Sequence, residues 1–189
     1  MELRETTKTR TYLYRGRIIN LRNDEVILPN GKPAGREVVE HPGGVCVAAL
    51  TDRDELLFVR QYRHPYEEIL LELPAGKLEP GEDPLVCGKR ELEEETGYTA
   101  ARYRFLGQLY PSPGYCAEII HMYLATGLSP SRMHPDEDEF LEPVRLPLKE
   151  AVCRILNGEI KDAKTQAAVL KLYALRCGAG DSDRKEGLQ

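Results

Sequence analysis

The order of apolar and polar positions along the chain predicts a sheet of short strands followed by helices. Two apolar, β-branched runs at residues 45–51 and 56–62 flank the polar triplet Asp52-Arg53-Asp54, a pattern typical of two strands joined as a hairpin. Shorter apolar runs predict further strands, at residues 70–73, 103–110, 119–125 and 140–146. Turn-rich stretches separate these runs, most clearly Pro111-Ser112-Pro113-Gly114 and the acidic, proline-containing residues 129–138.

A small antiparallel unit is predicted before this sheet, over residues 12–41. Its strand candidates are residues 25–28 and 37–41, which lie on either side of Pro29-Asn30-Gly31-Lys32, a turn signal. We therefore expect the chain to begin with a short β unit that is separate from the central sheet.

Helices are predicted after the strand at 70–73 and towards the end of the chain. Asp83-Pro84 supplies an N-cap and a first helical residue, and Gly97 can end that helix in a left-handed conformation. Residues 147–157 and 163–176 predict two more helices. In the first helix, the residues expected to face the sheet are Leu85, Cys87, Gly88 and Leu92.

Composition restricts the class of protein. The chain has 189 residues, 41% of them hydrophobic and 30% charged, and this length predicts one domain with an appended segment. The net charge of −5 argues against a general nucleic-acid binder, which would be basic. No apolar run is long enough to span a bilayer, and residues 1–10 lack the apolar core of a signal peptide. The cysteines at 46, 87, 116, 153 and 177 form no C-x-x-C pair, which indicates reduced thiols in a cytoplasm, and the scattered histidines predict no zinc site.

The candidate chemistry lies in residues 76–98, which read GKLEPGEDPLVCGKRELEEETGY. Glu91, Glu94 and Glu95 are spaced i, i+3 and i+4, so a helix places all three carboxylates on one face, where they repel unless a cation lies over them. Carboxylate oxygens suit Mg²⁺ or Mn²⁺, which also bind substrate phosphates. Arg90 is expected to pair with one of these carboxylates and to orient it.

An acidic helix face is more often solvated surface than a site. Here the flanking positions favour a site, because they match the pattern G-x5-E-x7-R-E-U-x-E-E-x-G-U, where U is a bulky apolar residue and Tyr98 fills the last position with an aromatic. The matching residues are Gly76, Glu82, Arg90, Glu91, Leu92, Glu94, Glu95 and Gly97.

This stretch resembles the Nudix box. The resemblance implies a metal-dependent hydrolase of a nucleoside diphosphate linked to another moiety, with an α/β/α sandwich built on a mixed sheet. The small N-terminal antiparallel β unit would precede that sandwich.

Further stretches narrow the resemblance to the bacterial ADP-ribose pyrophosphatases, over about residues 16–175. These stretches are Arg36-Glu37, Gln61-Tyr62-Arg63, Leu73-Pro74-Ala75-Gly76, Ser112-Pro113-Gly114 and Asp136-Glu137-Asp138-Glu139-Phe140. The resemblance implies Mg²⁺-dependent hydrolysis of ADP-ribose to AMP and ribose 5-phosphate, with two or more Mg²⁺ ions per site and Mn²⁺ as a possible substitute.

The resemblance also implies roles for single residues. The metal ligands would be the Ala75 carbonyl, Glu91, Glu95 and Glu82. The general base would be Glu139, with Glu137 as the alternative, while Glu94 and Arg90 support the site. The substrate would contact Arg36, Glu37, Arg63, Pro113, Gly114 and Glu118. The competing interpretation of Arg36 is an exposed strand charge, and that of Arg63 is a structural ion pair. Tyr14 is a candidate for stacking on adenine, although packing in an aromatic core is favoured for it.

The family resemblance implies three segments and a homodimer. Residues 1–42 would form a β unit exchanged between subunits, residues 43–177 the Nudix domain, and residues 178–189 a disordered tail. Partners other than the nucleotide-sugar substrate, such as nucleic acid or a membrane, are not expected. Three alternatives stay open: another substrate such as a GDP- or ADP-sugar or a diadenosine polyphosphate, a module that binds ADP-ribose without cleaving it, and a structural subunit.

Overall fold

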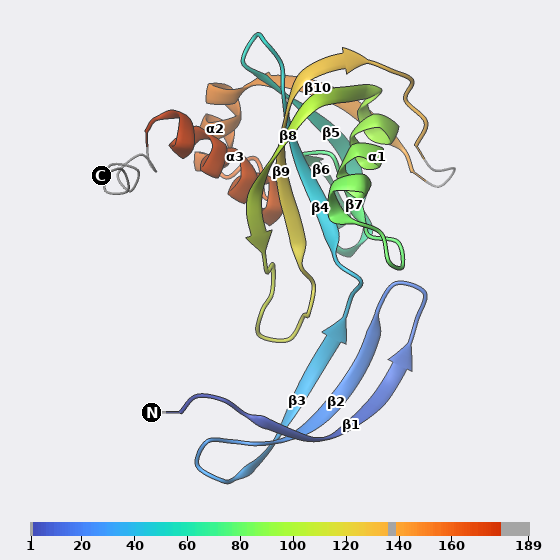
Figure 1. The fold of residues 1–189 in the computed structure, drawn as a ribbon, viewed down its shortest axis with the longest axis vertical. Helices are drawn as coiled ribbons and strands as arrows, with labels where there is room; N and C mark the ends of the chain where they lie inside the picture. Colours follow the sequence, from blue (N-terminus) through green and yellow to red (C-terminus); the bar gives the residue numbers. More distant parts are fainter. Residues whose placement is uncertain (1, 136–138, 179–189) are drawn as a thin grey trace, which may run out of the picture. The chain divides into compact units, whose positions relative to one another are not determined.

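The computed structural model describes residues 2–135 and 139–178, which belong to two compact units. The first unit comprises the chain up to Gly43 together with Tyr110–Ile119, and the second comprises Gly44–Leu109 and the chain from Ile120 onward. Figure 1 shows the strands and helices of both units in chain order. All but the first residue of the expected 178–189 tail lies outside the described residues.

The first unit is a three-stranded antiparallel sheet in the order β1-β2-β3 (Figure 1). Its strands are β1 (Thr6–Arg15), β2 (Asn20–Ile27) and β3 (Pro33–Glu40). The expected turn between β2 and β3 is confirmed: Gly31 has φ +81°, and Leu28 N–H donates to Lys32 O at 2.9 Å. The sequence prediction missed most of β1, which begins six residues before position 12, because its polar Thr and Lys positions carry no apolar signal.

The segment Tyr110–Ile119 pairs with β3 through its backbone. Val39 N–H donates to Tyr115 O at 2.8 Å, and Ala117 N–H donates to Val39 O at 2.9 Å. The Ser-Pro-Gly loop therefore belongs to the first unit, although it lies between two strands of the second.

The second unit is built on a mixed sheet whose central strands run in the order β10-β5-β4-β9-β8, with β6 beside β5 and β7 beside β4. The pair β4–β9 is parallel and the other pairs are antiparallel. The strands are β4 (Gly44–Leu50), β5 (Glu55–Arg63), β6 (Glu68–Glu72), β7 (Ala75–Lys77), β8 (Tyr98–Leu109), β9 (Ile120–Pro130) and β10 (Leu141–Pro147). The helices are α1 (Pro84–Thr96), α2 (Leu148–Leu156) and α3 (Ala163–Arg176), with a 3-10 turn η1 (His64–Tyr66) after β5.

The expected hairpin of β4 and β5 is only partly correct. Both strands exist, but they share a single register pair, Leu50 opposite Leu56, next to the turn. Beyond it, β4 pairs with β7 and β5 pairs with β6, so the two strands diverge and the β6–β7 connection fills the space between them.

Helices cover both faces of this sheet, which confirms the expected α/β/α sandwich. On β4, Val45, Val47 and Ala49 belong to the apolar clusters on the α1 side, and the alternate residues Cys46 and Ala48 belong to the cluster with α2 and α3. Strand β4 is buried on both faces, as expected for a central strand between two helical layers.

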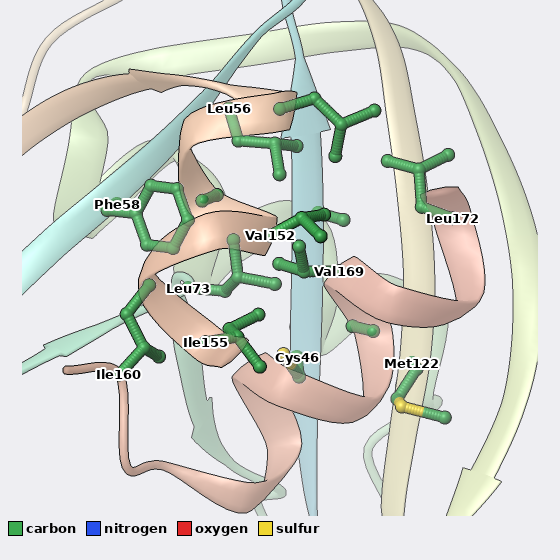
Figure 2. Packing of buried hydrophobic residues seen from close by; sticks show 14 of the residues in the cluster. Cys46, Leu56, Phe58, Leu73, Met122, Val152, Ile155, Ile160, Val169 and Leu172 are labelled. Carbon is green, nitrogen blue, oxygen red and sulfur yellow. The ribbon is translucent and has the colours of Figure 1, made fainter. Parts of the chain in front are cut away.

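The larger cluster packs α2 and α3 against the sheet (Figure 2). Leu56 and Phe58 from β5 and Leu73 meet Val152 from α2 and Val169 from α3. This packing fixes Leu73, and with it the start of the β7 strand that leads into α1. No helix in the described part of the chain is long and apolar enough to cross a membrane.

Candidate functional site

Helix α1 begins and ends where the sequence predicts. Asp83 Oδ1 accepts hydrogen bonds from Leu85 N–H at 2.9 Å and Val86 N–H at 3.2 Å, and Pro84 is the first helical residue. Gly97 ends the helix with φ +70°, and its N–H donates to Glu93 O. These caps fix the helix ends and so the face on which its carboxylates lie.

One face of α1 packs closely on the sheet. Cys87, Gly88 and Leu92 are buried, and a Cβ built on Gly88 would lie 3.4 Å from Val47 Cγ2 and 3.6 Å from the Tyr123 ring. Gly88 therefore faces the sheet as expected, although a Cβ at this position would make only ordinary van der Waals contacts.

Glu91 and Glu95 are buried on α1, with 6% and 2% of their surface exposed. Burial raises the pKa of Glu91 to about 7, against the opposing effect of Arg90, and the charge of Glu94 raises it further. Burial also raises the pKa of Glu95 well above its usual value, although the Ala75 N–H donates to Glu95 Oε2 at 3.0 Å and opposes that shift. Both carboxylates therefore lack sufficient positive charge around them within the protein.

Gly76 makes room for one of these carboxylates. A Cβ at residue 76 would lie 2.0 Å from Glu91 Cδ, so no larger residue fits without displacing Glu91. The position requires glycine because the backbone of β7 lies too close to the Glu91 carboxylate for any side chain to fit between them.

Arg90 links the remaining carboxylates, as expected from the sequence. Its Nε and Nη2 donate to Glu82 at 3.1 and 3.2 Å, and its Nη1 donates to Glu94 Oε2 at 2.9 Å and lies 2.7 Å from Glu91 Oε1. Glu82 also accepts from Glu79 N–H at 3.0 Å. Arg90 lowers the pKa of Glu82 and holds three carboxylates in fixed positions.

The backbone after β9 is fastened to the end of α1. Ser131 N–H donates to Gly97 O at 2.7 Å, and His134 N–H donates to Glu94 O at 3.0 Å. The acidic loop follows, and the negative charge of Glu139 is one of the causes that raise the pKa values of Glu91 and Glu95. Glu139 is thus near enough to interact with both, whereas Glu137 lies outside the described residues.

Arg63, at the end of β5, takes part in an ion pair whose partners the sequence did not identify. Its Nε and Nη2 donate to the two oxygens of Glu72 at 2.7 and 2.8 Å, and Lys164 Nζ also donates to Glu72. Burial opposes the charged form of Glu72, but the two cations outweigh it and lower its pKa to about 2. The alternative interpretation of Arg63 as an ion-pair residue therefore describes its contacts in this structure. A signal was present in the charged residue within the apolar run 69–73, but Lys164 lies 92 positions away.

The remaining predicted residues lie in the first unit. Arg36 Nε donates to Glu5 Oε2 at 3.0 Å, Glu37 is exposed on β3, and the Glu118 carboxylate lies 3.4 Å from His41 Nδ1. Pro113 and Gly114 are exposed in the loop. The structure therefore brings Ala75, Glu82, Arg90, Glu91, Glu94 and Glu95 together in the second unit, and places Arg36, Glu37, Pro113, Gly114 and Glu118 in the first.

The preferred interpretation of Tyr14 is wrong for the chain as described. Tyr14 is 57% exposed and its ring lies over Gly16, where a Cβ would be 2.5 Å from Tyr14 Cε1. Strand β1 is exposed along its whole length, so Tyr14 does not lie in an aromatic core formed by the residues that the structure describes.

The carboxylates of α1 suit a hard divalent cation. Among the described residues, no three His, Cys, Asp or Glu side chains converge as a ready-made set of metal ligands. However, Glu91 and Glu95 offer buried oxygen donors whose negative charge is poorly compensated, and the absence of a side chain at Gly76 leaves room for the Glu91 carboxylate. Oxygen donors of this kind fit Mg²⁺ or Mn²⁺ better than a softer metal.

Comparison with known families agrees with this arrangement. Residues 40–170 match the NUDIX domain, and residues 5–39 match the nucleoside diphosphate sugar hydrolase N-terminal domain. The chain belongs to the Nudix family.

Individual proteins are similar over most of their length. An ADP-ribose pyrophosphatase of Bacillus subtilis (strain 168) is 44% identical over 88% of this chain and 91% of its own. A methanol dehydrogenase activator of Bacillus methanolicus is 47% identical over 87% of this chain and 90% of its own. A crystal structure described as an ADP compounds hydrolase superposes with a TM-score of 0.82 at 26% identity, covering 95% of this chain and 98% of that one.

Proposed function

We propose that this protein is a Nudix pyrophosphohydrolase that cleaves ADP-ribose into AMP and ribose 5-phosphate. The observation that carries the chemistry is the pair of buried carboxylates Glu91 and Glu95, whose pKa values are both raised by burial. Glu91 lies against Gly76 and is only partly compensated by Arg90. The choice of substrate is supported by the Bacillus subtilis relative and by the match of residues 5–39 to a domain of nucleoside diphosphate sugar hydrolases.

Divalent cations such as Mg²⁺ are generally used in this family. Here the Ala75 carbonyl, Glu82, Glu91 and Glu95 would hold two or more Mg²⁺ ions, and Mn²⁺ could replace them. Such ions neutralise a pyrophosphate, acidify water and stabilise the leaving oxygen.

The side chains of the second unit would prepare the reaction. Arg90 fixes the orientation of Glu82 and Glu94 through its hydrogen bonds, so the carboxylates do not reorganise when substrate binds. Glu139, or alternatively Glu137, would take the proton from the attacking water. Glu139 is favoured because its charge raises the pKa values of Glu91 and Glu95, so it lies near both carboxylates.

Further residues are proposed to contact the substrate. Arg63 would contact the pyrophosphate through the donors that its pair with Glu72 does not use. In the first unit, the substrate would contact Arg36, Glu37, Pro113, Gly114 and Glu118.

A homodimer with exchanged N-terminal units forms part of the proposal. Its support is the exposed apolar surface of the first unit, where Leu13, Tyr14 and Ile18 are largely accessible in the single chain. We also place the protein in the cytoplasm, because all of its cysteines are free thiols. Sedimentation velocity of the full chain should give twice the mass of 21.4 kDa, and a monomer would exclude the exchange.

The test of function is Mg²⁺-dependent hydrolysis of a panel of compounds by the wild type and the Glu95→Gln variant. The panel contains ADP-ribose, GDP-mannose, ADP-glucose, a diadenosine polyphosphate and NADH. We expect ADP-ribose to give AMP and ribose 5-phosphate fastest, with no turnover in the variant or in EDTA.

Other outcomes select the alternatives. Faster cleavage of another compound would retain the Nudix chemistry and replace the substrate, a result that the differently named Bacillus methanolicus relative makes worth testing. Binding of ADP-ribose without turnover would identify a binding module in place of an enzyme.

A further inference from the structure

Glu72 is a fully buried carboxylate outside the Nudix motif, with 1% of its surface exposed. It accepts two parallel hydrogen bonds from Arg63, through Nε at 2.7 Å and Nη2 at 2.8 Å. This bidentate contact fixes the plane of the guanidinium as well as its position, which a single hydrogen bond would not do. The orientation of Arg63 is therefore set by β6, the strand paired with β5.

The pair leaves part of the guanidinium edge unused. A guanidinium carries more N–H donors than one carboxylate can accept, and neither Nη1 nor the second N–H of Nη2 is needed for the contact with Glu72. The two Nη nitrogens form the outer edge of the group, which can bind a phosphate through two further parallel hydrogen bonds. The Arg63 side chain is 36% exposed, so solvent, and with it a ligand, can reach part of the side chain.

A carboxylate this close would normally cancel the attraction of Arg63 for phosphate. Lys164, from the first turn of α3, neutralises the charge of Glu72. It donates to the same Glu72 oxygen that accepts from Arg63 Nη2. Lys164 also donates to Asp162 Oδ1 at 2.9 Å, and Asp162 caps α3, where the helix N-terminus offsets its negative charge. A cation in the first turn is unfavourable for the helix dipole, so Lys164 does not serve to stabilise α3. Its ion pair with Glu72 explains why a buried lysine lies at this position.

The strand carrying Glu72 is itself held by α3. Leu73 N–H donates at 2.9 Å to Oγ1 of Thr165, whose side chain is fully buried. Glu72, Lys164 and Thr165 thus form one rigid contact between β6 and the start of α3, close along the chain to Ala75. A shift of α3 would move the Arg63 guanidinium directly.

We propose that Glu72 and Lys164 are positioning residues: Glu72 orients Arg63 towards the substrate pyrophosphate, and Lys164 neutralises Glu72 so that Arg63 keeps its attraction for phosphate. The proposal rests on the proposed function, because it takes Arg63 as the pyrophosphate contact. It assigns to α3 a share in substrate binding, although no residue of α3 belongs to the Nudix motif.

The experiment measures binding and turnover in the full-length protein. Dissociation constants for the non-hydrolysable α,β-methylene analogue of ADP-ribose, with Mg²⁺, are obtained by calorimetry for the wild type, Glu72→Gln, Lys164→Gln and Arg63→Lys. We expect each substitution to weaken binding about tenfold to a hundredfold, the effect of losing a hydrogen bond to a charged group. For turnover, KM should rise by a similar factor, with a smaller change in kcat.

Glu68→Gln is the matched control. Glu68 lies on the same strand and pairs with Lys161, just before α3, but both side chains are exposed. Its dissociation constant should stay within about twofold of the wild type, because exposed pairs contribute little. A double variant, Arg63→Lys with Glu72→Gln, should bind no more weakly than Arg63→Lys alone, since the two residues act as one unit.

Several results would overturn the proposal. Wild-type binding by Glu72→Gln and Lys164→Gln, with only a lower melting temperature, would make the contact purely structural. If the fold-changes in dissociation constant of the two single variants multiply in the double variant, Glu72 acts independently of Arg63. If Glu72→Gln does not fold, Lys164→Gln decides, because it leaves the Arg63–Glu72 pair in place.

Failure of the proposed function gives a different pattern. A wild type that binds the analogue without hydrolysing ADP-ribose removes the hydrolase, while the dissociation constants of the variants still decide the role of Glu72. A wild type that does not bind the analogue overturns both.

Discussion

Glu72 and Glu95 are both almost fully buried, yet their surroundings act on them in opposite directions. Glu72 lies between Arg63 and Lys164, and its pKa falls to about 2. Glu95 receives one backbone hydrogen bond, from Ala75, and burial together with the charges of Glu91 and Glu139 raises its pKa well above the usual value. Side-chain cations therefore balance one carboxylate from within the protein and leave the other unbalanced.

This difference distinguishes a buried carboxylate that helps to hold the fold, Glu72, from a buried carboxylate that can bind a cation, Glu95. Partners compensate the desolvation of a buried charge, and a buried charge without partners weakens the folded state unless a ligand supplies the missing charge. Glu95 is in the second condition, and Glu91 is only partly compensated by Arg90, which suits a cation-binding site. Their cost to stability is offset by packing elsewhere, including the burial of Cys87 and Leu92 of α1.

The largest effect is expected for Glu95→Gln. Loss of the carboxylate should lower kcat for ADP-ribose by about 10³-fold or more, equivalent to ~4 kcal/mol of transition-state stabilisation. In EDTA the variant should be at least as stable as the wild type, because glutamine keeps the acceptor for Ala75 N–H without an uncompensated charge. Steady-state kinetics measures the loss of kcat, and urea unfolding in EDTA measures the stability. A variant that is both active and less stable than the wild type would contradict the contrast between Glu95 and Glu72.

Glu72→Gln should show the opposite behaviour, with a stability loss that depends on pH. The pKa of Glu72 is lowered from an unfolded value of about 4.3 to about 2, so its stabilisation is present above about pH 4.3 and is lost as pH falls towards 2. This shift corresponds to roughly 3 kcal/mol at neutral pH. Urea unfolding of wild type and variant from pH 7 to pH 3, in EDTA, should show the gap between them narrowing.

The same pH series sharpens the contrast at Glu95. Its folded pKa is raised, so its ionisation destabilises the native state increasingly as pH rises through that value. The stability of Glu95→Gln relative to wild type should therefore increase with pH, opposite to the trend at acid pH for Glu72→Gln. Parallel trends in the two variants would show that burial alone, and not the partners, sets these energies.

Gly76→Ala should have an intermediate effect on activity. Its Cβ would lie 2.0 Å from Glu91 Cδ and must displace that carboxylate, so kcat/KM should fall about tenfold to a hundredfold. The melting temperature should change little if the Glu91 side chain alone moves. Retention of full activity would show that the position of Glu91 is not critical.

The smallest effect is expected for Glu68→Gln. Its pair with Lys161 is exposed on both sides, so the free energy of unfolding should change by less than about 0.5 kcal/mol. Urea unfolding at pH 7 measures it beside Glu72→Gln. A loss comparable to that of Glu72→Gln would contradict the view that burial between two cations makes Glu72 important.

Caps and turns were predictable from the sequence, because each depends on residues that are neighbours along the chain. Asp83-Pro84 and Gly97 determine the ends of α1, and the turn at 29–32 joins β2 to β3, because caps and turns act over a few residues. The chemistry of α1 was equally accessible, since helical spacing alone places Glu91 and Glu95 on one side.

Long-range pairing was not visible in the pattern. The hairpin of β4 and β5 was overestimated because β6 and β7 take over their pairing, and the association of Tyr110–Ile119 with β3 depends on backbone hydrogen bonds that no side-chain pattern encodes. Glu72 escaped notice for the same reason, because its second cation, Lys164, comes from α3.

The hydrogen bond from Leu73 to Thr165 also bears on how the protein is made. It joins residues 92 positions apart, so during translation β6 and α1 leave the ribosome long before the helix that fastens them. Contacts so distant in sequence form late and slow the folding of a chain. A nascent chain therefore carries the complete set of motif glutamates before α3 can hold the strand beside them, and on our proposal the orientation of Arg63 is completed only after α3 has packed.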